Sequence, residues 1–461
     1  MIYILKTLRF INMNKVHILI LRDGKMELLR IRKSLSFKKQ VYSGALQVFC
    51  LLALALTAFE NCKGVKQGRF FNDQAYHFQT LRVFNDIRSD GADTGEILET
   101  ISHIEEGNAG SWFDAWEKTG DRIFQKAEGI IDPISRGQAY LRAHNYFRTA
   151  EFFLDPEDPK RPEAFDKQVR AFLLGLDSLS IKYERIHVPY GKYYLNAIYY
   201  PGPKGSDNKP LIVMVNGFDG TMEELYFDLV KSANERGFNV LTYEGPGQGS
   251  IIRNQNLPFN PEWEKPNTAV LDTFLTNHAK PGKMVLVGVS LGGYLASRTA
   301  AFEKRFDGLV AYDVMYDFGK VAENATPGIA LWLEKHEFYG LIEILVKIKS
   351  SFSPTFSWGI KNGRWTLGTK TTNETLSAMR KFSLSDVADK IDQDVLIFAG
   401  AEDHFIPISQ VDDFKKSLTN ARSVKVITYD RESGGAEHCQ LGAPTLWQAD
   451  FFDWMKKFEE K

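Results

Sequence analysis

Ser290 lies in a segment that favours nucleophilic chemistry, Gly288-Val289-Ser290-Leu291-Gly292. An apolar run at 284–287 precedes this segment, and a run typical of a helix follows it at 294–298. A strand, a sharp turn and a helix in this order form a nucleophile elbow, which exposes the serine hydroxyl at the tip of the strand. Amides at the start of the helix lie beside that hydroxyl and favour negative charge. The pattern predicts that Ser290 is a nucleophile.

A serine hydroxyl is a weak nucleophile at neutral pH, so it needs a base and an acid that orients the base. In chains with this elbow the acid comes after the serine and before the histidine. Asp403 follows an apolar run at 395–398, at the strand end where sites form in parallel sheets. We predict that Asp403 is the acid. The adjacent Glu402 and Asp313, which follows an earlier predicted strand, are alternatives.

His438 is the candidate base. It lies in a glycine-containing loop between the last predicted strand and the last predicted helix, 35 residues beyond Asp403. No other histidine follows His404. A lone loop histidine is usually only exposed, but here the elbow, the acid and the base occur together in the required order. The sequence therefore predicts a catalytic triad of Ser290, Asp403 and His438.

An oxyanion hole needs two amide donors, one from the residue after the nucleophile and one from a loop after an earlier strand. The first donor is predicted to be the amide of Leu291. The second is expected in the loop 215–221, directly after the apolar run 211–215. We assign it to the amide of Phe218, with the neighbouring Asp219 as the alternative.

Short apolar runs alternate with helical patterns in the second half of the chain and predict an α/β fold with a mostly parallel sheet covered on both faces. The glycine-rich segment 245–249 lacks the Lys-Ser/Thr of a phosphate loop and is predicted to be a tight turn beside the site. The predicted strands are 182–190, 192–200, 211–215, 239–243, 284–287, 308–313, 395–398 and 424–427. The predicted helices among them are 222–236, 268–278, 291–303 and 446–458.

Three parts are expected along the chain. Residues 1–70 form a basic tail with an apolar signal or anchor segment, 71–180 form a helical domain, and 181–461 form the sheet-containing domain. Within the last part, residues 317–390 are helical, irregular and rich in Phe and Trp. Such an insertion forms part of a lid over the site or packs on the surface, and the sequence leaves both open. The helices predicted in the helical domain include 115–126, 134–154 and 163–176.

The charge of the chain is unevenly distributed. Residues 1–40 carry ten Lys or Arg and two Asp or Glu. Because the whole chain has a net charge of −1, the other 421 residues carry −9. A mildly acidic body argues against a nucleic-acid partner, and 44% hydrophobic with 25% charged residues is typical of a globular protein. We expect a small-molecule substrate, and the sequence leaves homodimer formation open.

Residues 40–59 carry no charge, and 48–56 are continuously apolar. Several Lys and Arg precede them, and small residues lie near Thr57-Ala58. This layout is typical of a secretory signal, and it would be an ordinary one if translation began at Met26. About 20 residues also suffice for a membrane anchor. We expect export or anchoring through 40–59, with membrane contact only there, and a cytoplasmic protein is the alternative.

Metal and cofactor chemistry has little support in the sequence. Three cysteines are too few for a disulfide framework, and no pair of them has the spacing of a metal site. The nine histidines show no His-Glu-x-x-His arrangement. We therefore expect neither a metal nor another cofactor.

Several segments together resemble one subgroup of the α/β-hydrolases, which carries an N-terminal helical domain. The subgroup includes the 2,6-dihydroxypseudooxynicotine hydrolases, the polyketide-shortening hydrolases of melanin pathways and FrsA-like esterases. The resemblance covers roughly residues 110–460, and its segment Glu437-His438-Cys439 is more specific than the elbow. The segments that carry it are 139–153, 216–221, 244–249, 288–292 and 436–440.

The resemblance implies an α/β-hydrolase fold without a cofactor, in which the helical domain, residues 71–180, caps the cleft. It also implies cleavage of an ester or of a carbon–carbon bond next to a ketone. Several members carry an assisting acid in the oxyanion loop, and Asp219 takes that place here. The family usually has paired glycines where this chain has Asn216-Gly217, a departure within the loop that supplies the second donor.

Ester cleavage and carbon–carbon cleavage need the same triad, because His438 can protonate either an alkoxide or a carbanion leaving group. The sequence leaves this choice open and does not identify the substrate. An acyltransferase on the same scaffold is an alternative. A catalytically silent binding protein is another, and the complete set of predicted site residues argues against it.

Overall fold

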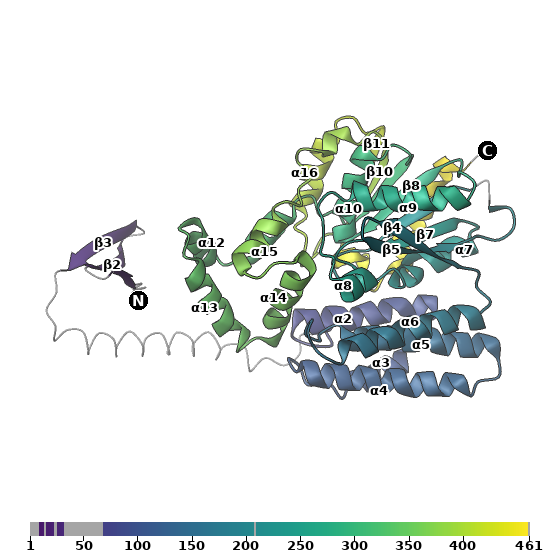
Figure 1. Ribbon diagram of the computed structural model, residues 1–461, viewed down its shortest axis with the longest axis horizontal. Helices are drawn as coiled ribbons and strands as arrows, with labels where there is room; N and C mark the ends of the chain where they lie inside the picture. The colour runs from purple at the N-terminus through teal and green to yellow at the C-terminus, as the bar shows by residue number, and fades with distance from the viewer. Residues whose placement is uncertain (1–8, 13–14, 23–24, 32–67, 207–208, 460–461) are drawn as a thin grey trace. The chain divides into compact units, whose positions relative to one another are not determined.

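The computed structural model describes residues 9–12, 15–22, 25–31, 68–206 and 209–459, which belong to two compact units (Figure 1). The first unit, within residues 1–66, holds an antiparallel sheet in the order β1-β2-β3, which the sequence analysis does not predict. The apolar segment 40–59 lies outside the described residues. No helix among the described residues has the length and apolar character needed to cross a membrane. The three strands are β1 Arg9–Asn12, β2 Lys15–Arg22 and β3 Lys25–Ile31.

The second unit, residues 67–461, is built on a sheet of eight strands in the order β11-β10-β9-β8-β6-β7-β5-β4. Neighbours from β11 to β7 run parallel, whereas β5 pairs antiparallel with both β7 and β4. The predicted mostly parallel sheet is therefore confirmed. Its strands are β4 Glu184–Tyr190, β5 Tyr193–Tyr200, β6 Leu211–Val215, β7 Asn239–Glu244, β8 Met284–Val289, β9 Gly308–Tyr312, β10 Asp394–Gly400 and β11 Ser423–Tyr429.

The central strands are buried on both faces, which explains their unbroken apolar sequences. Leu211, Val213 and Val215 of β6 belong to one apolar core, and Ile212 and Met214 belong to the other. Residues of α9 and α10 complete the first core, and residues of α6 and α17 complete the second. The bounds of these helices are α6 Arg161–Ser178, α9 Glu264–Asn277, α10 Leu291–Phe302 and α17 Pro444–Met455.

The predicted helical domain forms a layer beside the sheet-containing part (Figure 1). Its helices share a core of large aromatic side chains, among them Trp112, Trp116 and Tyr146. α5 begins where the sequence signals it, because Pro133 occupies the first turn and the side chain of Asp132 accepts a hydrogen bond from the Ser135 amide at 2.7 Å. Besides α6, the layer contains α2 Gln74–Asn85, α3 Thr94–Ile101, α4 Ala109–Glu128 and α5 Pro133–Glu151, with the short turn η1 Asp86–Ser89.

The insertion between β9 and β10 is helical and packs on the helical domain through α14 (Figure 1). The ring of Trp358 lies 4.7 Å from Phe152 and 5.4 Å from Phe153, centroid to centroid. The hydroxyl of Thr355 donates to Asp73 at 2.8 Å. The insertion therefore joins the two layers. Its helices are α11 Phe318–Ala325, α12 Gly328–Lys335, α13 Tyr339–Ser350, α14 Pro354–Leu367 and α15 Thr372–Met379.

Two predicted elements differ from the structure. The single helix expected at 222–236 is a π-helical turn, η3 Tyr226–Val230, followed by the short α7 Lys231–Glu235. The turn expected at 245–249 leads directly into a helix, α8 Gly249–Gln255. The carboxylate of Glu244 fixes this helix start, because it accepts from both the amide and the hydroxyl of Ser250. The remaining elements are η4 Ala388–Lys390, α16 Ser409–Ser417, η5 His438–Gln440 and η6 Lys456–Phe458.

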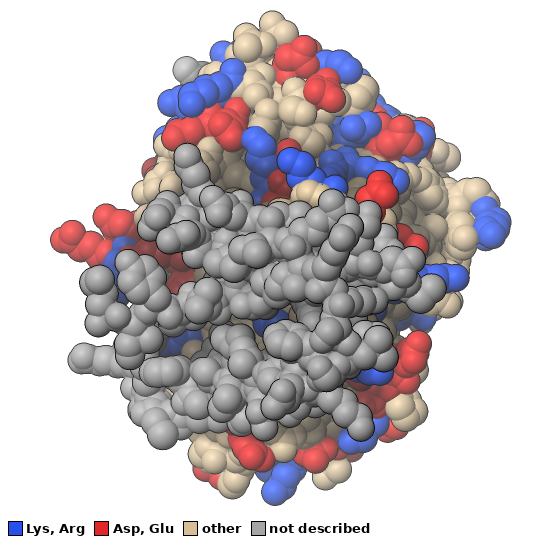
Figure 2. All heavy atoms as spheres, turned by 90° about the vertical axis from the view of Figure 1, so that its left-hand side faces the viewer, with Lys and Arg blue, Asp and Glu red and all other residues tan. Residues whose placement is uncertain are grey.

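Charged side chains of both signs are interspersed over the described part of the face in Figure 2. Neither Lys and Arg nor Asp and Glu form a continuous field over that part of the face.

Candidate active site

Ser290 occupies the sharp turn between β8 and α10. Its backbone has φ 61° and ψ −122°, a conformation that side-chain-bearing residues rarely adopt. A Cβ atom on Gly288 would lie 1.9 Å from the carbonyl oxygen of Gly292, so the turn can close only with glycine at that position. The predicted elbow is therefore present, with the serine at the carboxyl end of a central strand.

The structure brings Ser290, His438 and Asp403 together in one hydrogen-bonded series. The Nε2 of His438 lies 2.8 Å from the Oγ of Ser290, and its Nδ1 lies 2.6 Å from the Oδ2 of Asp403. The other oxygen of Asp403 accepts from the amides of Phe405 and Ile406 at 2.7 and 2.8 Å. The carboxylate is thus fixed by the backbone on one side and fixes the imidazole on the other.

The two alternative acids have other partners. Glu402 forms an ion pair with Arg431 at the surface. Asp313 is buried behind the histidine, where it accepts from the Cys439 amide at 2.8 Å and from Nε2 of Gln440 at 3.1 Å. Its Oδ2 is 3.7 Å from Nδ1 of His438, which is too long for a hydrogen bond. Asp403 is therefore the acid that bonds the imidazole.

Burial and the neighbouring charges shift the pKa values of His438 and Asp403 in opposite directions. Burial lowers the pKa of His438, but the adjacent Asp403 carboxylate outweighs it and holds the pKa well above the usual value. Burial raises the pKa of Asp403, but the histidine and its hydrogen bonds outweigh that and lower it. Burial and the charge of Asp403 raise the pKa of Asp313 to about 7. An imidazolium next to Asp403 is therefore strongly stabilised.

The loop after β6 lies against the nucleophile. A Cβ atom on Gly217 would lie 2.9 Å from the Cβ of Ser290 and 3.3 Å from the amide nitrogen of Leu291. Phe218 follows directly, and its ring stacks on Phe259 at 5.5 Å. The structure therefore brings the two residues predicted to supply the oxyanion donors, Leu291 and Phe218, to the same end of the sheet as Ser290.

Gln248 and Asn216 hold this loop, and sequence reasoning assigned no role to either side chain. The Nε2 of Gln248 donates to the carbonyls of Asn216 and Gly217 at 2.6 and 3.0 Å. The Asn216 side chain bonds the Gly217 amide and the Thr221 carbonyl. Asn216 thus fills the place of the usual first glycine and bridges the loop. The sequence feature that could have pointed to Gln248 is the glycine-rich segment 245–249, which contains it and is predicted to lie beside the site.

Asp219 lies at the start of a charged network that reaches the helical domain. Its Oδ1 is 3.4 Å from Nη1 of Arg82 in α2. Arg82 also pairs with Glu224 at 2.6 Å, and Glu224 pairs with Nε of Arg148 in α5 at 2.7 Å. The loop that carries the predicted oxyanion donor is therefore tied to two helices of the helical domain.

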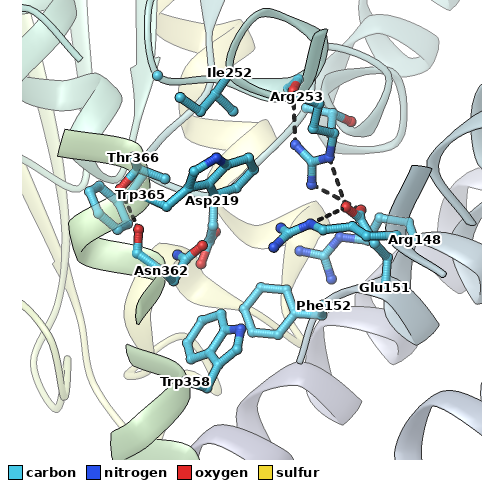
Figure 3. Close-up of a pocket in the computed structure, with 15 residues that line it drawn as sticks. Arg148, Glu151, Phe152, Asp219, Ile252, Arg253, Trp358, Asn362, Trp365 and Thr366 are labelled. Carbon is cyan, nitrogen blue, oxygen red and sulfur yellow. Dashed lines mark hydrogen bonds and ion pairs between the residues drawn. The ribbon is translucent and has the colours of Figure 1, made fainter. Parts of the chain in front are cut away.

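A pocket opens beside this loop, between α5, α8 and α14 (Figure 3). Its cavity volume is about 20 Å³, which is room for about one water molecule. We call it the arginine pocket. Its charged lining consists of Arg148, Glu151, Arg161, Asp219 and Arg253, and its aromatic lining consists of Phe152, Phe218, Trp358 and Trp365.

One group of described residues has the side-chain atoms of a metal site. Ligand atoms of Asp313, His438 and Cys439 lie within 4.8 Å of one another, and all three residues are buried. Two of the three are already engaged, since His438 bonds Asp403 and Asp313 accepts from the Cys439 amide. Burial also raises the pKa of the Cys439 thiol, which disfavours the thiolate that a metal binds. The hydrogen bonds around His438 therefore explain why these three side chains lie close together.

Comparison with known proteins agrees with this geometry. Residues 210–433 match the family model described as alpha/beta hydrolase fold. Hydrolase acrC of Aspergillus aculeatus is 31% identical, and the match covers 85% of this chain and 99% of that protein. 20-Hydroxy-prefusarin hydrolase FUS2 of Gibberella moniliformis is 29% identical over 84% of this chain and 97% of its own length.

The fold also recurs among solved structures. The crystal structure of 2,6-dihydroxy-pseudo-oxynicotine hydrolase matches with a TM-score of 0.64 at 20% identity, over 82% of this chain and 95% of that one. That match includes the helical domain as well as the sheet-containing part, given its coverage. The fold, the family model and relatives matched over nearly their full length all indicate the same family, and the chain belongs to the α/β-hydrolases.

Proposed function

We propose that this chain is a serine hydrolase in which Ser290 is the nucleophile, His438 the base and Asp403 the acid that orients the base. The observation that carries the proposal is the unbroken series from the Ser290 hydroxyl through the imidazole to the Asp403 carboxylate, with contacts of 2.8 and 2.6 Å. The strained backbone of Ser290 supports it, because strain of this kind occurs where function requires it.

In the proposed reaction His438 takes the hydroxyl proton while the Ser290 oxygen attacks the carbonyl carbon of the substrate. The amides of Leu291 and Phe218 stabilise the oxyanion that forms. The carbonyl re-forms as the bond to the leaving group breaks, and His438 gives its proton to that group. Water then attacks the acyl-enzyme by the same steps and releases the acid and Ser290.

The broken bond is an ester bond or a carbon–carbon bond next to a ketone. An ester releases an alkoxide, and a β-diketone releases a carbanion stabilised as an enolate. We propose that Asp219 assists the second case, because it follows the proposed oxyanion donor and lines the arginine pocket. Replacing Asp219 with Asn should then slow β-diketone cleavage more than hydrolysis of a p-nitrophenyl ester, whereas an equal loss on both would contradict this role.

A fluorophosphonate probe tests the nucleophile. The wild-type chain should be labelled, and Ser290→Ala should abolish labelling. Ser351→Ala is the matched control, because Ser351 is an exposed serine at the end of α13. Peptide mapping should place the label on Ser290. A folded wild-type chain that takes up no label would contradict the proposed function.

A further inference from the structure

The helix α2 lies in the helical layer on the side of the sheet-containing part (Figure 1). Four of its residues occupy positions i, i+3, i+4 and i+7, so their side chains share one face of the helix. This face contacts two loops of the active site, which we call the histidine loop, residues 430–443, and the oxyanion loop, residues 215–221. The four residues are Phe78, Leu81, Arg82 and Asn85.

Phe78 packs against the catalytic histidine itself. Its ring centre lies 6.0 Å from that of His438, and it meets the ring of Phe405 edge-on at 5.5 Å. Phe405 in turn lies edge-on to His438 at 5.1 Å, and its amide donates to the carboxylate of Asp403. The imidazole therefore has two aromatic neighbours, one of which comes from the helical domain.

Leu81 and Asn85 contact the end of the histidine loop. The Oδ1 of Asn85 accepts from the Gly442 amide at 3.2 Å, and a Cβ atom on Gly442 would lie 3.1 Å from Leu81. The backbone between His438 and this contact is strained, with φ 51° at Cys439 and 43° at Gln440. Such a backbone persists only where its surroundings impose it. α2 thus supplies part of what holds the histidine loop.

Arg82 contacts the other loop from the same helix face. Its Nη1 lies 3.4 Å from Oδ1 of Asp219, and its Nη2 lies 2.6 Å from Oε1 of Glu224. Asp219 directly follows Phe218, the proposed second oxyanion donor. The pair of Arg82 and Glu224 is largely buried, and solvent screens a buried pair less than an exposed one. α2 therefore holds the oxyanion loop as well.

No short chain connection sets the distance between the two loops. The histidine loop follows β11 and the oxyanion loop follows β6, and three other strands separate β11 from β6 in the sheet. In the proposed reaction the substrate oxygen lies at the oxyanion donors while the leaving group lies at His438. A misplacement of about 1 Å between such groups can cost about 100-fold in rate.

We propose that α2 is a clamp that sets the position of His438 relative to the oxyanion donors, and that Phe78 and Asn85 are positioning residues for the reaction. The proposal rests on the proposed function, because it assigns α2 a role in the reaction of Ser290. Phe78 and Asn85 keep the imidazole where it can give its proton to the leaving group, and Arg82 keeps the oxyanion loop in register with it.

Two butyrate esters with different leaving groups test the clamp on the full-length chain. Phenolate is a stronger base than p-nitrophenolate, so phenyl butyrate depends more on the proton from His438 than p-nitrophenyl butyrate does. Phe78→Ala lets the imidazole move and should lower kcat/KM for phenyl butyrate by about 100-fold. The loss on p-nitrophenyl butyrate should be several-fold smaller. Equal losses on both esters, or no loss on either, would overturn the role of Phe78.

Phe84→Ala is the matched control on the same helix. Phe84 stacks on Phe70 at 4.8 Å and packs on the aromatic core of the helical domain. Its truncation removes a ring of the same size from α2 and should leave both rate constants nearly unchanged. If Phe84→Ala were as slow as Phe78→Ala, loosening of the helix rather than the contact with His438 would explain the loss, and the clamp would be refuted.

Asn85→Ala covers the case in which Phe78→Ala does not fold. It removes the acceptor of the Gly442 amide and leaves the aromatic contacts of His438 in place. It should show the same pattern, with the larger loss on phenyl butyrate. Wild-type rates on both esters in Asn85→Ala would overturn its assignment as a positioning residue.

The rate of fluorophosphonate labelling separates this proposal from the proposed function and needs no turnover of either ester. His438 must act as base in that reaction, so Phe78→Ala should be labelled about 100-fold more slowly than the wild type. Labelling of both at the same rate would refute the clamp and leave the hydrolase intact. A folded wild-type chain without labelling would refute the proposed function, and with it a role of α2 in this reaction.

Discussion

Asp313 lies 3.7 Å from the imidazole nitrogen of His438 that already bonds another carboxylate. Both acids are buried, and both follow strands of the central sheet. Only Asp403 reaches hydrogen-bond distance, whereas Asp313 is turned toward the backbone of Cys439 and the side chain of Gln440. The histidine therefore lies between an acid that orients it and an acid that supports the loop behind it.

Exchanging each acid for its amide should separate these roles. Asp403→Asn should lower kcat by about 10⁴-fold, because the amide favours the wrong imidazole tautomer. Asp313→Asn should lower it far less, since the unpartnered Oε1 of Gln440 can turn to accept from the new amide. Steady-state kinetics with a p-nitrophenyl ester measures both variants. Comparable losses would show that Asp313 takes part in orienting His438.

The raised pKa of Asp313 predicts a pH dependence of stability. Its pKa is about 7 in the folded chain against an ordinary value of 3.8, so the folded state binds more protons between these pH values. The contribution of Asp313 to the free energy of unfolding should therefore fall as pH rises through this window. Urea unfolding of the wild type and Asp313→Asn at several pH values tests this. The variant should gain stability relative to the wild type as pH increases, and parallel curves would contradict the prediction.

Gly217 is predicted to be indispensable for the chemistry. Gly217→Ala would place a methyl group 2.9 Å from the Cβ of Ser290 and 3.3 Å from the Leu291 amide. We expect kcat to fall by about 100-fold or more, as when one oxyanion donor is lost. Gly359→Ala is the control, because no atom lies within 4 Å of its Cβ position in α14. It should keep full activity and raise stability by up to about 1 kcal/mol. An active Gly217→Ala enzyme would place the oxyanion site elsewhere.

Glu151 is predicted to stabilise the fold. Burial raises its pKa, but the charges of Arg253 and Arg161 outweigh burial and lower it below the ordinary value of 4.5. Its stabilisation is therefore complete above that pH and is lost as pH falls through the lower, folded-state value. Glu151→Gln should reduce the free energy of unfolding by about 3–5 kcal/mol at neutral pH, because it leaves buried guanidinium groups unpaired.

Chemical unfolding of Glu151→Gln at two pH values is the measurement. The difference from the wild type should shrink below the ordinary pKa of 4.5. Asp453→Asn removes an exposed ion pair with Lys456 and should leave the transition unchanged. A constant difference at all pH values would mean that Glu151 acts through packing rather than charge.

The strands were predictable because burial on both faces leaves an unbroken apolar run, as in β6, which matches its predicted range of 211–215. The π-helical turn at Tyr226–Val230 was not predictable. The spacing of apolar residues indicates a helix, but it does not distinguish α-helical from π-helical hydrogen bonding. The helix α8 was missed because seven residues are too few for a period, and its start depends on the carboxylate of Glu244.

The triad residues were predictable because their order along the chain is constrained by the fold. Sequence could not separate Asp403 from Asp313 by geometry, because both follow strands and only a distance in space distinguishes them. Arg148 and Trp358 carried no local signal at all. They come from a helix before the sheet and from an insertion within it, and only tertiary packing brings them to one pocket.

Trp358 and Trp365 line the arginine pocket from an insertion that follows β9, whereas Ser290 is fixed by β8 and α10. Substitutions in α14 therefore reshape the wall of the pocket without altering the turn that strains the serine. Natural selection can therefore alter the wall of this pocket and leave the strained turn at Ser290 unchanged, because the two features are encoded in separate stretches of one gene.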